Sequence, residues 1–303
     1  MQAWWMVLAA FFFASMTVCV KFASQGFSSA ELVFYRGVLG ILIMWLLARS
    51  QHIGLATRYP GMHAWRCLIG VTAMGGWFYG IAHLPLATAV TLNYMSSIWI
   101  AVFIVGGAII AWRPSASHKT PPLQGTLVLT VLVGFAGVVL MLRPSMGPHQ
   151  GFAAMIGLLS GMCAAFAYMQ VVALSRIGEP ETRVVFYFSI GSTLAGLAAM
   201  LVSGLSDWDW KAAAWLLPMG VLASLGQLCM TRAYSRAGSQ RGTLVVANLQ
   251  YSGIVFAAIY GLVLFGDRMP LLGWAGMALI ISSGIAATVL RGRAAPGSPA
   301  EER

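Results

Sequence analysis

The chain has 303 residues, of which 59% are hydrophobic and 9% are charged, and its mean hydropathy is +0.81. A water-soluble protein of this size needs much more polar surface, so this composition excludes a soluble globular fold and indicates a membrane protein. The formal net charge is +10, but the basic residues lie mostly in short connections between apolar stretches, and they do not indicate a nucleic-acid-binding surface.

Apolar stretches long enough to cross a bilayer recur along the whole chain. A hydrocarbon core of about 30 Å requires roughly 20 helical residues. The charge-free interval 67–112 is about twice that length, so it must fold back, and His83 and Pro85 mark the turn. We predict ten transmembrane helices without a soluble domain. In chain order, they are expected near residues 3–22, 30–48, 65–82, 86–111, 122–142, 151–174, 184–203, 212–232, 243–265 and 271–290.

The basic residues predict the orientation in the membrane, because connections on the cytoplasmic side are enriched in Lys and Arg. With the N-terminus inside, only Arg143, Lys211 and Arg268 fall on the outer side. The cytoplasmic side then holds Arg49, Arg58, Arg66, Arg113, Lys119, Arg176, Arg183, Arg232, Arg236, Arg241, Arg291, Arg293 and Arg303. We therefore expect a multi-pass protein of a bacterial inner (cytoplasmic) membrane, with both termini in the cytoplasm.

Similar segments in the two halves of the chain indicate an internal duplication. Residues 13–18 (FASMTV) resemble residues 166–171 (FAYMQV), and the tripeptide VFY occurs at both 33–35 and 185–187. Five crossings are an odd number, so the second copy must be inverted relative to the first. Inverted repeats are typical of secondary transporters. The predicted parts are a first five-helix repeat at 1–146, an inverted second repeat at 147–292, and a disordered cytoplasmic tail at 293–303.

Three features carry a resemblance to a known family. They are the paired halves, the pattern from Lys21 through Glu31 to Arg36, and the segment 264–267 (LFGD) at the end of the ninth helix. The chain resembles the EamA family of the drug/metabolite transporter (DMT) superfamily over residues 1 to about 291. Asp267 stands where the family segment usually has Glu. The resemblance implies a bundle with a substrate cavity between the two halves, closed alternately from either side, with efflux as the default direction.

Lys21, Glu31 and Arg36 are the ionisable residues within predicted spans, where a charge is costly without a partner or a wet cavity. Lys21 and Glu31 are expected at the same end of the first two helices, where they could pair. Arg36 is expected to face the cavity or another helix. The counterparts of Lys21 and Arg36 in the second half are Leu174 and Phe188, so the charge is asymmetric, as a site for an asymmetric substrate requires. The alternative is that both cations reach the interface.

Uncharged polar and aromatic residues in the middle of the spans complete the candidate site. Their hydrogen bonds could instead tie helices together, and the aromatic rings could serve core packing. No ion site formed by a discontinuous helix is evident from the sequence. The predicted substrate-binding or gating residues are Lys21, Glu31, Arg36, Thr17, Trp77, Tyr79, Asn93, Tyr94, Ser97, Tyr168, Gln170, Gln227, Asn248 and Tyr251.

The sequence gives little support for an enzyme. The histidines lie in loops or at a helix end, and no base accompanies a candidate serine within a span. Neither a phosphate-binding glycine-rich segment nor a cluster with metal-ligand spacing is present, and the four cysteines lie singly on different helices. We therefore expect neither a cofactor nor a metal.

These features predict a secondary transporter of small metabolites, acting by alternating access. The favoured cargo is an amino acid or a related amphipathic compound with a carboxylate, because cations outnumber the acid and aromatic rings suit an apolar part. Uptake of S-adenosylmethionine or another metabolite is the first alternative, and a lipid flippase or a membrane sensor is another. The expected partners are the lipid bilayer and the small-molecule substrate, with protons as a coupling ion through Glu31 and a homodimer left open.

Overall fold

The computed structural model describes residues 2–84, 86–111, 125–142, 150–264 and 270–292. Over these ranges the chain forms α-helices and their connections, without a β-strand. Within the same ranges, nine helical segments are long and apolar enough to cross a membrane. The protein is therefore an all-α integral membrane protein, as its composition predicts.

Most of the predicted helices are continuous, and three are divided. The continuous helices are α1 (Gln2–Ala23), α2 (Ser29–Ser50), α3 (Pro60–His83), α6 (Gly125–Leu142), α7 (Gly151–Arg176), α8 (Glu181–Ser203) and α13 (Leu271–Gly292). The predicted helices at 86–111, 212–232 and 243–265 are divided into α4 (Leu86–Tyr94) and α5 (Ser96–Ala111), α9 (Trp210–Ala213) and α10 (Leu216–Ser235), and α11 (Gln240–Leu249) and α12 (Ser252–Leu264).

The start of α3 differs from its prediction. The helix begins at Pro60 rather than near residue 65, because proline has no amide hydrogen to lose at a first helical position and its φ already suits a helix. Arg66, the second residue of the predicted helix, consequently lies more than one turn inside α3.

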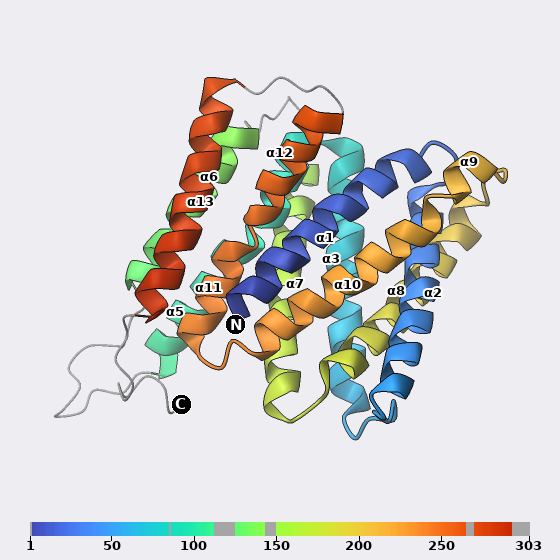
Figure 1. Ribbon diagram of the computed structural model, residues 1–303, viewed down its shortest axis with the longest axis horizontal. Helices are drawn as coiled ribbons and strands as arrows, with labels where there is room; N and C mark the ends of the chain where they lie inside the picture. The colour runs from blue at the N-terminus through green and yellow to red at the C-terminus, as the bar shows by residue number, and fades with distance from the viewer. Residues whose placement is uncertain (1, 85, 112–124, 143–149, 265–269, 293–303) are drawn as a thin grey trace.

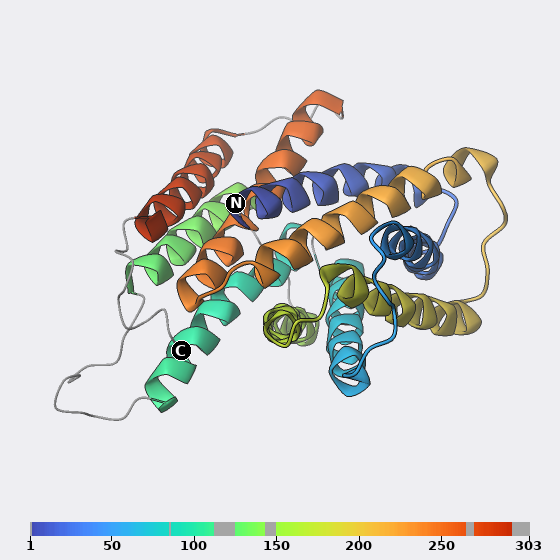
Figure 2. The same cartoon turned by 60° about the horizontal axis from the view of Figure 1, so that its bottom comes forward.

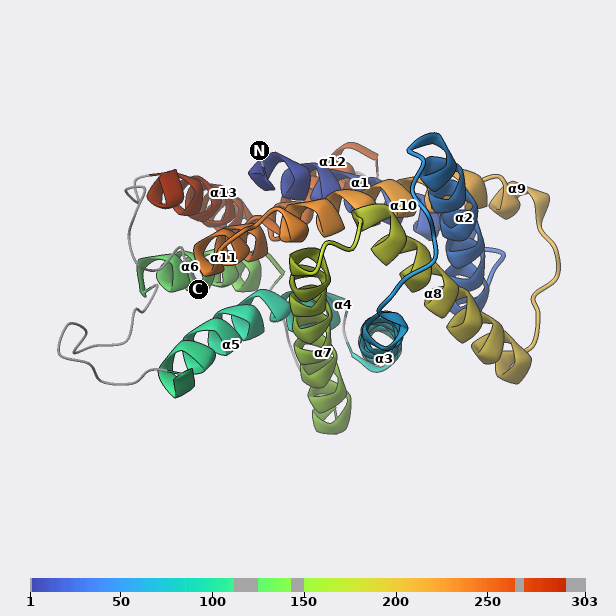
Figure 3. The same cartoon turned by 90° about the horizontal axis from the view of Figure 1, so that it is seen from below.

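The helices pack mainly in pairs: α2 against α8, α1 against α10, α6 against α13, and α3 against α7. Figure 1 shows α1 and α10 running side by side across the bundle, and Figure 2 shows α6 beside α13. Seen from below in Figure 3, α3 lies next to α7 and α2 next to α8. Every pair joins a helix from the first part of the chain to one from the second, so the two parts share their packing surfaces.

Glycines allow the closest of these contacts. A Cβ atom placed on Gly196 of α8 would lie 2.6 Å from the amide nitrogen of Phe34 on α2. A Cβ atom on Gly137 of α6 would lie 2.7 Å from the carbonyl oxygen of Gly276 on α13. Lipid chains are as apolar as the helix surfaces, so membrane helices associate through such close packing rather than through the hydrophobic effect.

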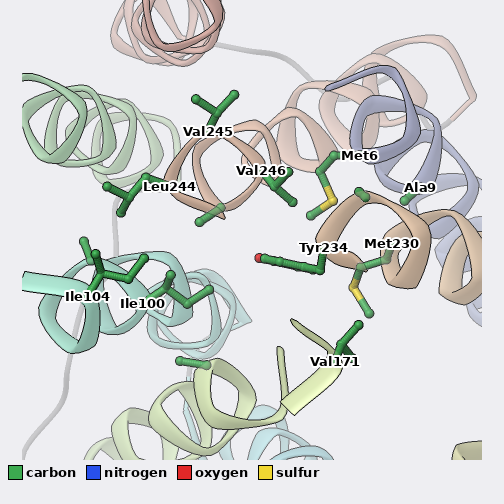
Figure 4. Close-up of a cluster of buried hydrophobic side chains, with 14 of the residues drawn as sticks. Met6, Ala9, Ile100, Ile104, Val171, Met230, Tyr234, Leu244, Val245 and Val246 are labelled. Atoms are coloured by element: carbon green, nitrogen blue, oxygen red, sulfur yellow. The ribbon is translucent and has the colours of Figure 1, made fainter. Parts of the chain in front are cut away.

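A cluster of buried apolar side chains forms where α1, α5, α7, α10 and α11 meet. Figure 4 shows Tyr234 of α10 in the middle of this cluster, with Met6, Ile100, Val171 and Val246 around it. The Tyr234 side chain is fully buried. Helices from both parts of the chain therefore meet around one aromatic ring, which lies next to the polar groups described below.

Candidate functional site

Two of the helix divisions, between α4 and α5 and between α11 and α12, correct the expectation of continuous helices at 86–111 and 243–265. The chain between α4 and α5 is Met95, and between α11 and α12 it is Gln250 and Tyr251. At the second division the Tyr251 amide donates to the Asn248 carbonyl at 3.1 Å. This hydrogen bond spans three residues, whereas an α-helical hydrogen bond spans four. The Ala247 carbonyl is thereby left for another donor.

Ser97, the second residue of α5, supplies that donor. Its Oγ donates to the Ala247 carbonyl oxygen at 2.7 Å, and the serine is fully buried. Next to this bond, the rings of Tyr94 and Tyr251 lie 6.0 Å apart between centroids. The two discontinuous helices therefore meet near their divisions, and they bring together the predicted residues Tyr94, Ser97 and Tyr251.

Asn248 ties α11 to α13. Its Nδ2 donates to the Ser283 carbonyl at 3.1 Å, and the Ser283 hydroxyl donates to Asn248 Oδ1 at 3.3 Å. Both side chains are buried. Asn248 therefore ties two helices together by hydrogen bonds, which is the alternative to a substrate contact for these polar residues.

Gln250 is a residue that the sequence reasoning missed. Its Oε1 accepts from the Tyr234 hydroxyl at 3.3 Å, and its Nε2 donates to the Tyr168 hydroxyl at 3.5 Å. The two tyrosine rings stack with centroids 5.2 Å apart and an interplanar angle of 11°. An amide in the middle of the charge-free interval 242–266 was the signal that could have identified Gln250.

Arg36 lines a small pocket between α2, α8 and α10. The predicted residue Gln227 lies in the same lining, and so does Phe188, the apolar counterpart of Arg36. The cavity measures about 10 Å³, which is the space of roughly one water molecule. The bundle is therefore nearly closed at this level, and a larger ligand requires the helices to move apart.

Arg66 is a second cation in this region and was not among the predicted site residues. Its side chain is 3% exposed, and its Nε and Nη1 atoms have no hydrogen-bond partner among the described residues. Its guanidinium carbon lies 4.4 Å from the centroid of the Phe188 ring. Arg36 and Arg66 are both within electrostatic range of the Tyr168 hydroxyl. Arg66 was counted with the orienting cytoplasmic cations because it is the second residue of the predicted helix 65–82, next to the helix end.

The described carboxylates do not neutralise these two arginines. None of their oxygens lies within 4.0 Å of a nitrogen of Arg36 or Arg66. The described residues also contain no group of three or more His, Cys, Asp or Glu side chains placed to hold a metal ion. Arg36 in the pocket and Arg66 on the Phe188 ring therefore give this region positive charge, which suits an anion.

Glu31, near the start of α2, holds the connection between α8 and α9. Its carboxylate accepts from the Ser28 amide at 2.6 Å, the Ser206 amide at 3.0 Å and the Ser206 hydroxyl at 2.6 Å. The Ser28 hydroxyl in turn accepts from the Glu31 amide, which completes a capping box at the start of α2. Lys21 lies exposed in the last turn of α1, at the same end of the bundle. The substrate or gating roles of Glu31 and Lys21 stay predictions.

Glu179 has the corresponding position at the opposite end, between α7 and α8. Its carboxylate accepts from Thr57 Oγ1 at 2.8 Å, His63 Nε2 at 3.2 Å and Arg183 Nη1 at 3.0 Å. Burial alone raises the pKa of Glu179, but these hydrogen bonds and the Arg183 charge outweigh it and hold that pKa below its ordinary value. The connection 51–59 is thus held against the start of α8.

The remaining predicted residues do not line the Arg36 pocket. The Thr17 hydroxyl donates to the Phe13 carbonyl of its own helix at 2.9 Å and is exposed. Tyr79 stacks on His83 at 4.0 Å, at the end of α3. Trp77 on α3, Asn93 on α4 and Gln170 on α7 are partly buried, as is Tyr79.

A separate apolar groove of about 450 Å³ lies between α1, α11, α12 and α13. Its lining includes Trp4, Phe256 and Ile281, and its polar members are Asn248, Ser252 and Thr288. It holds no charged side chain among the described residues, so it differs chemically from the arginine pocket.

Comparison with known proteins finds membrane transporters. The chain is 31% identical to the pseudopaline exporter CntI of Pseudomonas aeruginosa over 285 residues, which cover 92% of this chain and 93% of the relative. It is 28% identical to an uncharacterized transporter of Helicobacter pylori over 291 residues, with 92% and 91% covered. It is also 26% identical to a riboflavin transporter of Rhizobium johnstonii over 288 residues, with 93% and 89% covered.

A solved crystal structure shares the fold at 16% sequence identity. The superposition has a TM-score of 0.76 and covers 96% of this chain and 98% of the other. No family model matches the chain. The similarity to solved proteins therefore concerns the arrangement of the helices, and the similarity in sequence concerns transporters.

Proposed function

The chain belongs to the family of membrane transporters that includes the pseudopaline exporter CntI, and from this premise we propose that it exports small amphipathic metabolites that carry a carboxylate. Amino acids and their derivatives are the first class to test. The relatives support transport of small molecules, whereas the carboxylate is inferred from the site. Transport is secondary and proceeds by alternating access.

The observation that carries this proposal is the charge of the pocket. Arg36 lines the pocket together with Phe188, and Arg66 stacks on the same Phe188 ring, and neither has a carboxylate partner among the described residues. Cations within a bundle are retained where they have a partner or a functional role. A substrate carboxylate supplies the partner, and the rings of Phe188 and Tyr168 suit its apolar part.

The pairing of the helices supports two inverted repeats, at 1–146 and 147–292, of the EamA type within the DMT superfamily. In that arrangement α1, α2, α3 and α6 correspond to α7, α8, α10 and α13. If each helix is replaced by its counterpart in the other half, the same four packing pairs result. The pairs α2–α8 and α6–α13 each become themselves, and the pairs α1–α10 and α3–α7 become each other. The two divided helices also correspond, as is typical of repeat transporters.

The same arrangement supports the proposed orientation, with both termini in the cytoplasm. Helix α1 begins and α13 ends at the lower end of the bundle in Figure 1. Arg49, Arg176 and Arg232 lie in last helical turns at that end. By the positive-inside rule this end faces the cytoplasm, and the membrane is the bacterial inner membrane.

In an alternating-access cycle, the buried carboxylates of Glu31 and Glu179 would each hold one end of the bundle closed. Glu31 holds the connection at one end of the α2–α8 pair and Glu179 holds it at the other. Because the Arg36 pocket is nearly closed, the substrate enters when one of these ends opens. Protons provide the coupling, since a proton on Glu31 removes the charge that its bonds with Ser206 depend on.

The apolar groove between α1, α12 and α13 is the observation that favours a lipid flippase as the second candidate. The groove could accommodate an acyl chain, but its described lining has no charge to hold a head group. Uptake of S-adenosylmethionine is disfavoured by charge, because two arginines repel its sulfonium. Export of a carboxylate fits both the two arginines and the uncharged lining of the groove.

The test is transport by purified protein in proteoliposomes, preceded by a thermal-shift screen of metabolites, because a ligand that binds the folded state raises its apparent stability. We expect Arg36→Ala to abolish transport and to leave insertion and folding intact. Arg49→Ala is the matched control, since Arg49 is exposed at the end of α2 and stacks on Trp45. Equal transport by Arg36→Ala and wild type would remove Arg36 from the mechanism.

A further inference from the structure

We propose that Arg36 and Arg66 together bind two carboxylates of one substrate, so that the cargo is a dicarboxylate rather than a metabolite with a single carboxylate. This inference rests on the proposed transport function and adds the substrate class. It assigns a binding role to Arg66, which the charge pattern of the sequence places among the orienting cytoplasmic cations.

The two guanidinium groups reach one region from different helices. Arg36 comes from α2 and lies in the pocket lined by Phe188 of α8. Arg66 comes from α3, and its guanidinium carbon lies 4.4 Å from the centroid of the same Phe188 ring. The hydroxyl of Tyr168, on α7, is in electrostatic range of both. Four helices thus converge on two cations, an aromatic ring and a phenol.

The burial of Arg66 and its unpaired nitrogens favour a binding role for its guanidinium. The side chain is 3% exposed, yet its Nε and Nη1 find no acceptor among the described residues. A buried charge without a partner is strongly unfavourable, so the site is complete only with an anion. A carboxylate accepts two parallel N–H bonds from a guanidinium edge, and this geometry suits Arg better than Lys.

The number of charges distinguishes one carboxylate from two. The described carboxylates lie elsewhere: Glu31 bonds to Ser206, Glu179 pairs with Arg183, and no carboxylate lies within 4.0 Å of Arg36 or Arg66. A substrate with one carboxylate leaves either the buried Arg66 or the partly buried Arg36 uncompensated. A dicarboxylate neutralises both, and Phe188, which is near both arginines, offers an apolar contact for the chain that joins the two acid groups.

Gly70 shows how closely the Arg66 side chain is positioned. A Cβ atom on Gly70 would collide with Arg66 Nη1 and lie 2.8 Å from the Phe188 ring. Alanine at this position displaces the guanidinium without removing its charge. Gly75 lies on the same helix with nothing within 4 Å of its added Cβ, so Gly75→Ala is a matched control.

The experiment measures the apparent melting temperature of the purified full chain with α,ω-dicarboxylates from succinate to suberate. Monocarboxylates of equal chain length and inorganic phosphate are compared at equal ionic strength. We expect a dicarboxylate of one preferred length to raise the melting temperature of wild type, and the others to have little effect. Arg36→Gln and Arg66→Gln should each weaken its binding at least about tenfold, because each loses charge-assisted hydrogen bonds. Arg49→Gln should bind it as wild type does.

Gly70→Ala keeps the test decisive if Arg66→Gln fails to fold, because its charge is unchanged: it should bind the dicarboxylate more weakly than Gly75→Ala. Equal stabilisation by monocarboxylates or by phosphate overturns the two-carboxylate site. If dicarboxylates have no effect while another solute stabilises the protein and is transported, this inference fails and the transport function stands. If no solute is transported, the proposed function itself fails.

Discussion

Replacing Glu179 by Gln removes a buried negative charge that holds the connection 51–59 to the start of α8. The Glu179 side chain is 3% exposed and accepts hydrogen bonds from Thr57, His63 and Arg183 at 2.8, 3.2 and 3.0 Å. A glutamine has the same size but only one acceptor oxygen and no charge. The variant therefore tests the electrostatic part of this arrangement with little change in packing.

The expected cost is moderate rather than extreme. Removing one partner of a fully buried ion pair costs about 3 to 5 kcal/mol. Arg183 retains its hydrogen bonds to the Gly54 carbonyl, and its side chain is 17% exposed, so part of that cost is avoided. We expect a loss of about 2 to 3 kcal/mol, since a hydrogen bond to a charged group contributes about 1.5 to 3 kcal/mol. This corresponds to a fall in melting temperature of about 5 °C or more.

The assay is thermal unfolding of the purified protein in detergent, with Glu181→Gln as the control. Glu181 lies two residues further on, is 24% exposed, and its Oε1 is 3.7 Å from Arg236 Nε and 4.0 Å from Arg232 Nε. Exposed pairs of this kind contribute about 0 to 1 kcal/mol. Equal losses in the two variants would refute the claim that burial makes Glu179 the stronger contact.

The pH dependence provides a second test of Glu179. Its folded-state pKa is depressed, so its contribution to stability is fully present above the pKa of an unfolded glutamate, about 4.3. The contribution is lost as the pH falls through the lower folded-state pKa. Below about pH 4.3, the melting temperature of wild type should therefore approach that of Glu179→Gln. A difference between the two proteins that stays constant down to pH 3 would contradict the depressed pKa.

Three further substitutions test other contacts by the same melting assay. Glu31→Gln should cost about 1 to 3 kcal/mol, because a charged acceptor of three hydrogen bonds is lost, and a change near zero would show that they contribute nothing. Ser97→Ala should cost about 0.6 to 1.7 kcal/mol through its 2.7 Å bond to the Ala247 carbonyl, and a gain in stability would contradict this. Gly196→Ala should lower the yield of folded protein, because the added Cβ atom forces α2 and α8 apart. Gly75→Ala should leave the yield unchanged. Equal yields of the two variants would count against close packing of α2 and α8.

Much of the fold could be predicted from the sequence because the hydrocarbon core imposes a length and a polarity on each span. The predicted and observed bounds differ by a few residues at most helix ends, and by five at the start of α3. Arg36 could be predicted as a candidate for the same reason, since a charge inside an apolar span needs an explanation wherever its partner lies. Gln227 was also a predicted site residue, and it lines the same small pocket as Arg36.

The sequence by itself determined where the chain crosses the membrane, because that depends on local composition. Tertiary structure alone decided which side chains meet. Arg66 is near a predicted helix end, and only the packing of α3 against α8 buries it on Phe188. The division before α12 depends on Ser97, far away in the sequence, for the free Ala247 carbonyl. Such contacts join residues that no local pattern relates, so they become visible only when the two halves are packed together.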